Sequence, residues 1–318
     1  MKPKKHISWL LALAAAFCVT SCSAAETSPG SASGAESVQQ TASLADRSRT
    51  EAGGSAAVGR PEGAESFAQA HDAFQTTLIR QDRDDDPIPE PPEGVFDLIR
   101  YPSKVGDLAA YISSDPGDGE RHPLIIWVVG GWGNGISDFP WTYPDWENDQ
   151  TASAFWRSGI LTMYPSFRGG NGNPGYYEAL FGEVDDLVAA CDYAASLPYV
   201  DPDRIYLGGH STGGTRALLA AEYTDRFRAV FCFGPVDLVK YHNNDQFTFD
   251  TSADEEFVMR SPVYWLDDVR TPTFLIEGSL GNASRLKKIL EATDNPNING
   301  YVVMGADHFS VLGPVTPL

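Results

Sequence analysis

One serine lies among closely spaced glycines, in the segment Gly208-Gly209-His210-Ser211-Thr212-Gly213-Gly214. The apolar residues before this segment predict a strand at 205–207, and the pattern after it predicts a helix at 213–223. On a sharp turn from strand to helix the serine hydroxyl is exposed, and the flanking glycines let neighbouring backbones approach closely. The segment lacks the lysine of a phosphate-binding loop and the spacing of a dinucleotide-binding loop. It therefore predicts Ser211 as a catalytic nucleophile.

A serine nucleophile needs a general base, and in this kind of site the base follows the serine in the chain. Of the six histidines, His6, His71 and His122 lie far before the serine in the chain. His210 adjoins Ser211, and the backbone direction there is expected to point its side chain away. His308 follows the last predicted strand, where a loop can bring its ring to the serine, whereas His242 lies in a polar stretch. We therefore predict His308 as the base, with His242 as the alternative.

The third member of such a site is a carboxylate that orients the imidazole and stabilises its charged form. It is expected at the end of a strand that lies between the serine and the histidine in sequence. Glu277 and Asp237 each follow a predicted strand. Asp307 is adjacent to His308 and is therefore poorly placed to face its ring. Glu277 is the predicted acid, and Asp237 is the alternative.

Two N–H groups are needed to stabilise the oxyanion that forms when the serine attacks a carbonyl. The first is expected to be that of Thr212, directly after the nucleophile. The second is expected from the loop Gly130-Gly131-Trp132-Gly133, which follows a continuous apolar run. Within this loop we predict the Trp132 N–H, with the Gly131 N–H as the alternative.

Short apolar runs alternate with amphipathic segments from residue 94 onward. Two strands joined by a turn are predicted at 96–101 and 108–113. Further strands are predicted at 124–129, 160–164, 205–207, 229–233, 273–276 and 301–304, and helices at 183–196, 213–223 and 286–292. Strands that alternate with helices predict an α/β fold with a mostly parallel central sheet flanked by helices. Ligands of such a sheet bind at the carboxyl ends of its strands.

The first 93 residues lack these patterns. Three lysines, a short apolar stretch and the small residues before Cys22 resemble a bacterial lipoprotein signal, in which the cysteine is lipidated after cleavage. Residues 1–22 are therefore predicted as a signal peptide, 23–93 as a disordered tether rich in Ser, Ala, Gly and Pro, and 94–318 as a catalytic domain. The expected location is the bacterial cell envelope, with a lipid anchor to a membrane on its periplasmic or extracellular face.

The net charge of the chain is −20 at pH 7. So acidic a protein repels phosphate backbones, and nucleic-acid binding is not expected. The motifs imply no metal ion and no organic cofactor. Cys191 and Cys232 lie in apolar surroundings, so we expect two buried free thiols rather than a disulfide.

Four further motifs accompany the segment around Ser211. In chain order they are Phe167-Arg168-Gly169-Gly170, Phe181-Gly182-Glu183-Val184-Asp185-Asp186, Val200-Asp201-Pro202-Asp203-Arg204-Ile205 and Gly234-Pro235-Val236-Asp237. Together they make residues 124–237 resemble the catalytic domain of the prolyl oligopeptidase family, which has the α/β-hydrolase fold. The resemblance implies a serine peptidase, in which Arg168 either contacts substrate or forms an ion pair with Asp185 or Glu183.

Two departures from the family pattern affect these expectations. The family's catalytic aspartate ends a His-Gly-x-x-Asp pattern, whereas here Gly281 holds the acid position of the stretch Glu277-Gly278-Ser279-Leu280-Gly281-Asn282. The chain before residue 94 is too short and too polar for the family's β-propeller, which restricts access to small peptides. The expected substrate is therefore a peptide or a small-molecule ester. A carboxylesterase or dienelactone-hydrolase-like enzyme, and a non-catalytic surface-tethered binding protein on the same fold, are the alternatives.

Overall fold

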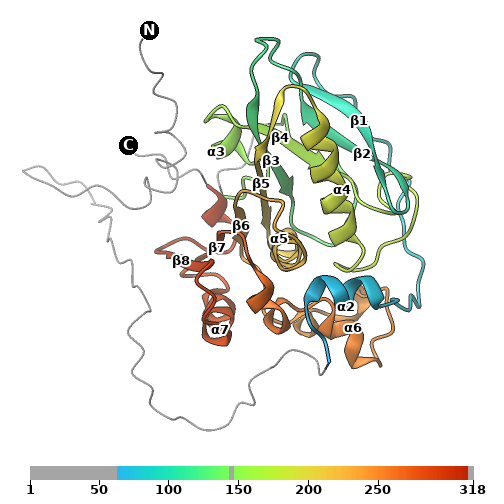
Figure 1. Cartoon of the computed structure of the whole chain (residues 1–318), viewed down its shortest axis with the longest axis vertical. Helices are drawn as coiled ribbons and strands as arrows, with labels where there is room; N and C mark the ends of the chain where they lie inside the picture. Colours follow the sequence, from blue (N-terminus) through green and yellow to red (C-terminus); the bar gives the residue numbers. More distant parts are fainter. Residues whose placement is uncertain (1–62, 143–146, 314–318) are drawn as a thin grey trace, which may run out of the picture. The chain divides into compact units, whose positions relative to one another are not determined.

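A twisted sheet of eight strands forms the centre of the computed structural model, which describes residues 63–142 and 147–313 (Figure 1). The strands are β1 (Phe96–Ser103), β2 (Gly106–Ser113), β3 (His122–Val128), β4 (Leu161–Pro165), β5 (Val200–His210), β6 (Val230–Phe233), β7 (Thr273–Gly278) and β8 (Ile298–Val303). Their order in the sheet is β1-β2-β4-β3-β5-β6-β7-β8. β1 and β2 pair antiparallel, β2 pairs antiparallel with β4, and all other neighbours are parallel.

Six α-helices of the described residues accompany the sheet. They are α2 (Phe67–Ala73), α3 (Ser153–Trp156), α4 (Glu183–Ser196), α5 (Thr212–Tyr223), α6 (Asp254–Val258) and α7 (Ala283–Ala292). Five one-turn 3-10 helices lie in the connections, among them η4 (Leu266–Asp268). An eight-stranded sheet with one antiparallel end and helices after its parallel strands is the α/β-hydrolase fold that the sequence predicts, and this prediction is confirmed.

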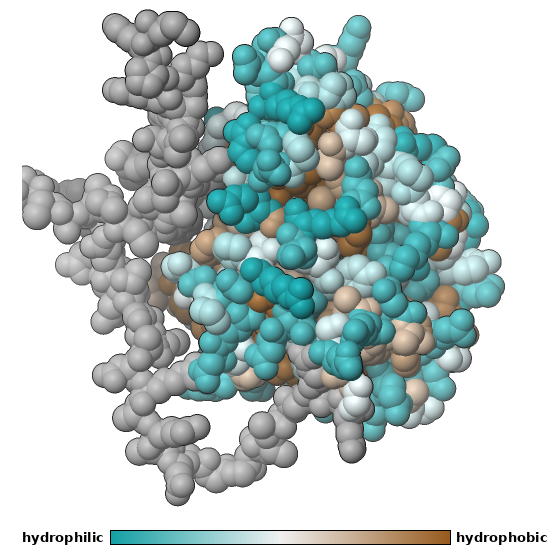
Figure 2. Space-filling model, in the orientation of Figure 1, coloured by the Kyte–Doolittle hydropathy of each residue, from teal (hydrophilic) through white to brown (hydrophobic). Residues whose placement is uncertain are grey.

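The main core lies between the sheet and helices α4, α5 and α7. Alternate residues of β3 point to opposite faces of the sheet, because side chains in a strand alternate. Leu124, Ile126 and Val128 join the core cluster on the helix side. Trp127 points the other way, where its ring lies 5.8 Å from that of Phe155 in α3. Hydrophilic residues cover most of the face drawn in Figure 2, and apolar side chains show between them in scattered patches.

Residues 63–93 differ from the prediction of a disordered tether. Phe67 of α2 is fully buried, and its ring lies 5.2 Å from that of Trp265. Further along, the Asp84 N–H donates to the Gly169 carbonyl at 2.8 Å, and Asp84 Oδ1 accepts from the Asn171 N–H at 2.7 Å. The predicted boundary at residue 94 is therefore wrong for this stretch. Its average composition is polar, but a few apolar and hydrogen-bonding anchors suffice to dock it.

The signal peptide, Cys22 and residues 23–62 of the predicted tether lie outside the described residues. Within the described ranges, no helix has the length and apolarity needed to cross a bilayer. Cys191 and Cys232 are both buried and free, which confirms the expectation of two unpaired thiols. Burial raises the pKa of both, so neither is a reactive thiolate at neutral pH.

Candidate active site

Ser211 occupies the sharp turn between β5 and α5. Its backbone has φ 56° and ψ −119°, a conformation that non-glycine residues rarely adopt. Such a backbone costs on the order of 1–3 kcal/mol and persists only where the surrounding structure holds it. Here the Ser211 N–H donates to the Phe233 carbonyl of β6 at 2.7 Å. The turn thus presents the serine side chain at the carboxyl end of the central strands, as the sequence predicts.

Two glycines make this turn possible. A Cβ atom on Gly209 would lie 2.5 Å from the Gly213 carbonyl oxygen, and one on Gly213 would lie 2.3 Å from the Val128 carbonyl oxygen. Both distances are too short for any side chain, and both involve backbone atoms that cannot swing aside. The spacing of glycine, serine and glycine in the sequence is therefore a direct consequence of how closely β3, β5 and α5 pack.

His308 and Glu277, the predicted base and acid, lie in direct contact. His308 Nδ1 lies 3.0 Å from Glu277 Oε2, and the Glu277 side chain is 1% exposed. The other carboxylate oxygen, Oε1, accepts from the Gly278 N–H at 2.7 Å, which fixes the carboxylate at the end of β7. Because an ionised carboxylate can only accept, Nδ1 carries the ring hydrogen. In the neutral ring Nε2 then keeps a lone pair for a serine hydroxyl.

Glycines also make room for this pair. A Cβ on Gly234 would lie 2.4 Å from His308 Cε1. A Cβ on Gly281 would lie 2.6 Å from Glu277 Oε1 and 2.6 Å from the backbone nitrogen of His308. Gly281 is the position at which the family pattern places an aspartate, and the space that an aspartate needs there is filled by Glu277. The two acid positions are thus alternatives, and this chain carries the one on the strand.

The alternative acid and the alternative base lie elsewhere. Asp237 pairs with Arg285, whose Nη1 lies 3.3 Å from Asp237 Oδ1. The His242 ring lies edge-on to Trp132, with ring centroids 5.0 Å apart. Burial and the charge of Arg285 lower the pKa of His242. Neither residue therefore has the environment of a catalytic partner of Ser211.

The loop at 130–133 lies directly against the nucleophile. A Cβ on Gly130 would lie 3.2 Å from Ser211 Cβ, and the Thr212 hydroxyl donates to the Gly131 carbonyl. That carbonyl and the Trp132 N–H belong to one trans peptide and so point in opposite directions. The Trp132 N–H is therefore turned away from the Thr212 side chain, and the Trp132 and Gly131 N–H groups both stay candidates for the second oxyanion donor.

A hydrogen-bonded relay joins this loop to the base, and the sequence did not reveal it. Gln150 Oε1 accepts from the Gly130 N–H at 3.2 Å, and Gln150 Nε2 lies 2.7 Å from His210 Nδ1. His210 Nε2 lies 2.8 Å from the His308 carbonyl oxygen. An amide nitrogen only donates and a carbonyl only accepts, so His210 carries its hydrogen on Nε2.

His210 is neutral in this relay, because burial lowers its pKa to about 4. The side chain expected to point away thus holds the loop that carries the base. The histidine itself was visible beside the serine, but nothing in the sequence connected it to Gln150. Asn282 is a further neighbour that sequence reasoning missed, with its side-chain nitrogen 3.2 Å from His308 Nδ1.

Arg168 is buried in ion pairs, which favours the structural alternative over the predicted contact with substrate. Its side chain is 5% exposed and binds Asp186 twice, from Nε at 3.0 Å and from Nη2 at 2.9 Å. Its Nη1 lies 2.6 Å from Glu178 Oε1. The ion pair foreseen as the alternative exists, but its main partners are Asp186 and Glu178, and Asp185 is 3.9 Å away. The guanidinium fixes the loop 167–170 to the start of α4.

This fold and site define an α/β-hydrolase. The sequence model of the prolyl oligopeptidase family matches residues 146–313, just over half of the chain. The chain therefore belongs to the prolyl oligopeptidase family. No curated protein sequence matches it significantly.

Solved structures of hydrolases share the fold. A puromycin-hydrolyzing peptidase of Mycobacterium tuberculosis is 22% identical, with 71% of this chain and 39% of that chain covered and a TM-score of 0.57. Dipeptidyl peptidase 4 of Porphyromonas gingivalis is 20% identical, with coverages of 67% and 32% and a TM-score of 0.53. A 2,6-dihydroxy-pseudo-oxynicotine hydrolase is 18% identical, with coverages of 68% and 63% and a TM-score of 0.53. The chain thus spans about two fifths or less of the two peptidases.

Proposed function

We propose that the protein is a serine hydrolase that cleaves its substrate through an acyl-enzyme on Ser211. The observation that carries the proposal is the contact between His308 Nδ1 and the buried Glu277 carboxylate at 3.0 Å, together with the strained turn that holds Ser211 at the carboxyl end of β5. A histidine held by a buried carboxylate, together with a partly exposed serine, can form a serine nucleophile activated by a general base.

The steps follow from these parts. His308 Nε2 takes the Ser211 hydroxyl proton as the oxygen attacks the substrate carbonyl, and Glu277 stabilises the imidazolium that forms. The N–H groups of Thr212 and of Gly131 or Trp132 stabilise the oxyanion. His308 then returns the proton to the leaving group. Water attacks the acyl-enzyme in the reverse sense, again with His308 as the base.

For the substrate, we propose a short peptide or amide with an apolar group beside the scissile bond. The family supports peptide bonds. The apolar preference rests on three exposed side chains, Leu280, Met304 and Phe309, on the loops that carry Gly281 and His308. These loops are joined by the bond from the Leu280 N–H to the Ala306 carbonyl at 2.9 Å.

A carboxylic ester is the second candidate substrate. The described residues contain no propeller over the carboxyl ends of the strands. A site without such a filter is open to substrates other than small peptides. A non-catalytic binding protein remains the competing class, and it predicts a serine with no enhanced reactivity.

Fluorophosphonate labelling tests the proposal, because the probe reacts only with activated serines. We expect the wild-type protein to be labelled and folded Ser211→Ala protein to remain unlabelled. A folded wild-type protein that takes up no label would contradict the hydrolase proposal. A parallel screen of p-nitrophenyl esters against aminoacyl and prolyl p-nitroanilides would then decide between ester and amide bonds.

The N-terminal lipid anchor is a further part of the proposal, and it rests on the lysines, apolar stretch and Cys22 of the sequence. We expect wild-type protein expressed in bacteria to partition into the detergent phase of Triton X-114 and Cys22→Ser protein to leave it. Equal partitioning of both would contradict lipidation at Cys22.

A further inference from the structure

His71 of α2 is a buried histidine, and one of its ring nitrogens has no hydrogen-bond partner. The residue is 3% exposed and packs between the rings of Phe67, Phe181 and Tyr223. Its Nε2 lies 3.2 Å from the Phe181 carbonyl oxygen. Because that carbonyl only accepts, Nε2 carries the hydrogen and Nδ1 of the neutral ring is left with its lone pair.

Two carboxylates face this lone pair. Asp72 Oδ1 lies 3.9 Å and Asp185 Oδ1 lies 4.0 Å from His71 Nδ1, and Nδ1 has no hydrogen-bond partner. Neither oxygen is close enough to accept a proton from Nδ1, so protonation of the ring gains no hydrogen bond there.

We propose that His71, Asp72 and Asp185 bind a divalent transition-metal ion, with zinc as the best fit. Their three ligand atoms all lie within 4.8 Å of one another. Tetrahedral zinc with bonds of about 2.1 Å separates its ligand atoms by roughly 3.4 Å. The two distances from His71 Nδ1 must therefore shorten by roughly half an ångström, and no pair of ligand atoms by more than about 1.4 Å. The Asp72 side chain, which is 55% exposed, has the freedom to make this movement.

The hydrogen bond at the other ring nitrogen supports a metal role. Histidines that ligate metals usually donate their second N–H to a carbonyl or carboxylate, which orients the ring and fixes its tautomer. His71 already has this arrangement through Phe181. Imidazole nitrogen with two carboxylates suits zinc, whereas calcium and magnesium prefer sites made of oxygen alone.

The other charged groups around the cluster define the competitor for the metal. Lys104 Nζ lies 2.8 Å from Asp185 Oδ1 and 3.6 Å from Asp72 Oδ1. The Tyr223 hydroxyl donates to Asp72 Oδ1 at 2.9 Å, and Arg168 Nη2 lies 3.9 Å from Asp185 Oδ2. The Lys104 side chain is 60% exposed, so its ammonium can move into water when the metal binds. Zinc binding and the lysine ion pair therefore exclude each other.

The bound metal would fasten α2 to α4 and hold the segment at 63–93 on the domain. A ligand that binds only the folded state stabilises it in proportion to the logarithm of its concentration over Kd. Zinc is thus expected to raise the thermal unfolding midpoint without a requirement for turnover.

Isothermal titration of EDTA-treated, dialysed full chain with ZnCl₂ tests the site. We expect one zinc ion per chain, an at least tenfold weaker affinity in Asp72→Asn and Asp185→Asn, and a tighter affinity in Lys104→Met. His122→Ala is the matched control, because His122 also lies beside an aspartate, 3.1 Å from Asp118 Oδ1, but on the surface. It should bind zinc as the wild type does.

Three results would overturn the proposal: no zinc binding by folded wild-type chain, unchanged affinity in both aspartate variants, or loss of binding in His122→Ala. Asp72 is exposed, so its variant is expected to fold. Cobalt replacement gives a second readout, since visible absorption bands should appear in the wild type and not in Asp72→Asn.

Discussion

Glu277 reaches His308 from the strand itself, whereas the family pattern places an aspartate four residues later, on the following loop. The longer glutamate side chain compensates for the earlier position. At the later position Gly281 has no space for a side chain, because Glu277 Oε1 and the His308 backbone lie 2.6 Å from the place of its Cβ. The glutamate at 277 and the glycine at 281 therefore depend on each other. An aspartate placed at 281 while Glu277 is kept would clash with the Glu277 carboxylate.

Replacement of Glu277 by glutamine is the direct test of this exchange. The amide cannot stabilise the imidazolium and lets His308 adopt the wrong tautomer, so we expect kcat to fall roughly 10³–10⁴-fold. Asp237→Asn should change kcat less than about threefold, because Asp237 pairs with Arg285. Both are measured on the best substrate of the ester and anilide screen. Equal small effects of the two variants would contradict the assignment of Glu277.

The relay through Gln150 and His210 gives a second prediction at this scale. Gln150→Leu removes the acceptor of the Gly130 N–H and the donor to His210. With the oxyanion loop and the base loop no longer joined, we expect kcat to fall about tenfold, in line with the loss of one supporting hydrogen bond of about 1.4 kcal/mol. KM should change little. Gln69→Leu, at an exposed glutamine of α2, is the control. A Gln150→Leu variant with a raised KM and an unchanged kcat would argue against a positioning role for Gln150.

The residues of the proposed catalytic site could be predicted from the sequence for a physical reason. Ser211, Glu277 and His308 each follow an apolar strand, and parallel strands bring their carboxyl ends together. Gln150 lies in an irregular connection with no periodic pattern, so its contact with His210 depends on the tertiary fold alone. The sequence left two roles open for Arg168, because a motif gives the residue type but not whether its side chain is buried.

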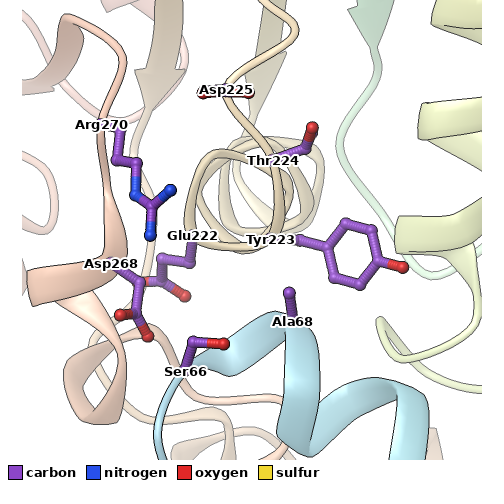
Figure 3. A pocket seen from close by; sticks show the side chains of 8 residues that line it. All are labelled: Ser66, Ala68, Glu222, Tyr223, Thr224, Asp225, Asp268 and Arg270. Carbon is purple, nitrogen blue, oxygen red and sulfur yellow. The ribbon is translucent and has the colours of Figure 1, made fainter.

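At the scale of elements, α5 carries the nucleophile at one end and an unusual carboxylate at the other. Glu222 is 3% exposed, and neither of its oxygens has a hydrogen-bond partner. It lines a cavity of about 150 Å³ between α5, α2 and η4, where Asp268 and Arg270 also lie (Figure 3). Burial, and then the charge of Asp268, raise the pKa of Glu222 well above its usual value of 4.5.

This shift makes the stability depend on pH in a defined direction. Below pH 4.5 Glu222 is protonated in both the folded and the unfolded chain, and its titration costs nothing. Above that pH only the unfolded chain ionises, so the free energy of unfolding falls by up to about 1.4 kcal/mol per pH unit. Glu222→Gln removes this loss.

Urea unfolding at pH 5 and pH 8 measures the effect. Relative to the wild type, Glu222→Gln should gain more stability at pH 8 than at pH 5. Glu291→Gln, which alters an exposed glutamate on α7, should show no such change. A pH-independent difference between Glu222→Gln and the wild type would mean that Glu222 ionises in the folded state.

At the scale of the whole chain, the sequence located the sheet and missed the start of the domain. The strands are visible because most of them contain a short apolar run. Residues 63–93 are mostly polar, and their attachment rests on single anchors such as Phe67 and Asp84. A window average hides such anchors, since one fully buried ring contributes as much as a run of half-buried residues.

Two truncated chains and two point variants test whether this stretch belongs to the folding unit. A chain of residues 94–318, cut at the boundary that composition suggests, removes Phe67 from its contact with Trp265 and Asp84 from its contacts with Gly169 and Asn171. We expect it to aggregate or to unfold at much lower urea than a chain of residues 63–318. Phe67→Ala in the full chain isolates one anchor and should cost about 3–5 kcal/mol of unfolding free energy. Ile79→Ala, at a side chain that is 60% exposed, should cost less than about 1 kcal/mol. If the shorter chain unfolds at the same urea concentration as the longer one, residues 63–93 add nothing to the stability of the domain. The folding unit would then begin at residue 94, as the composition of the sequence predicts.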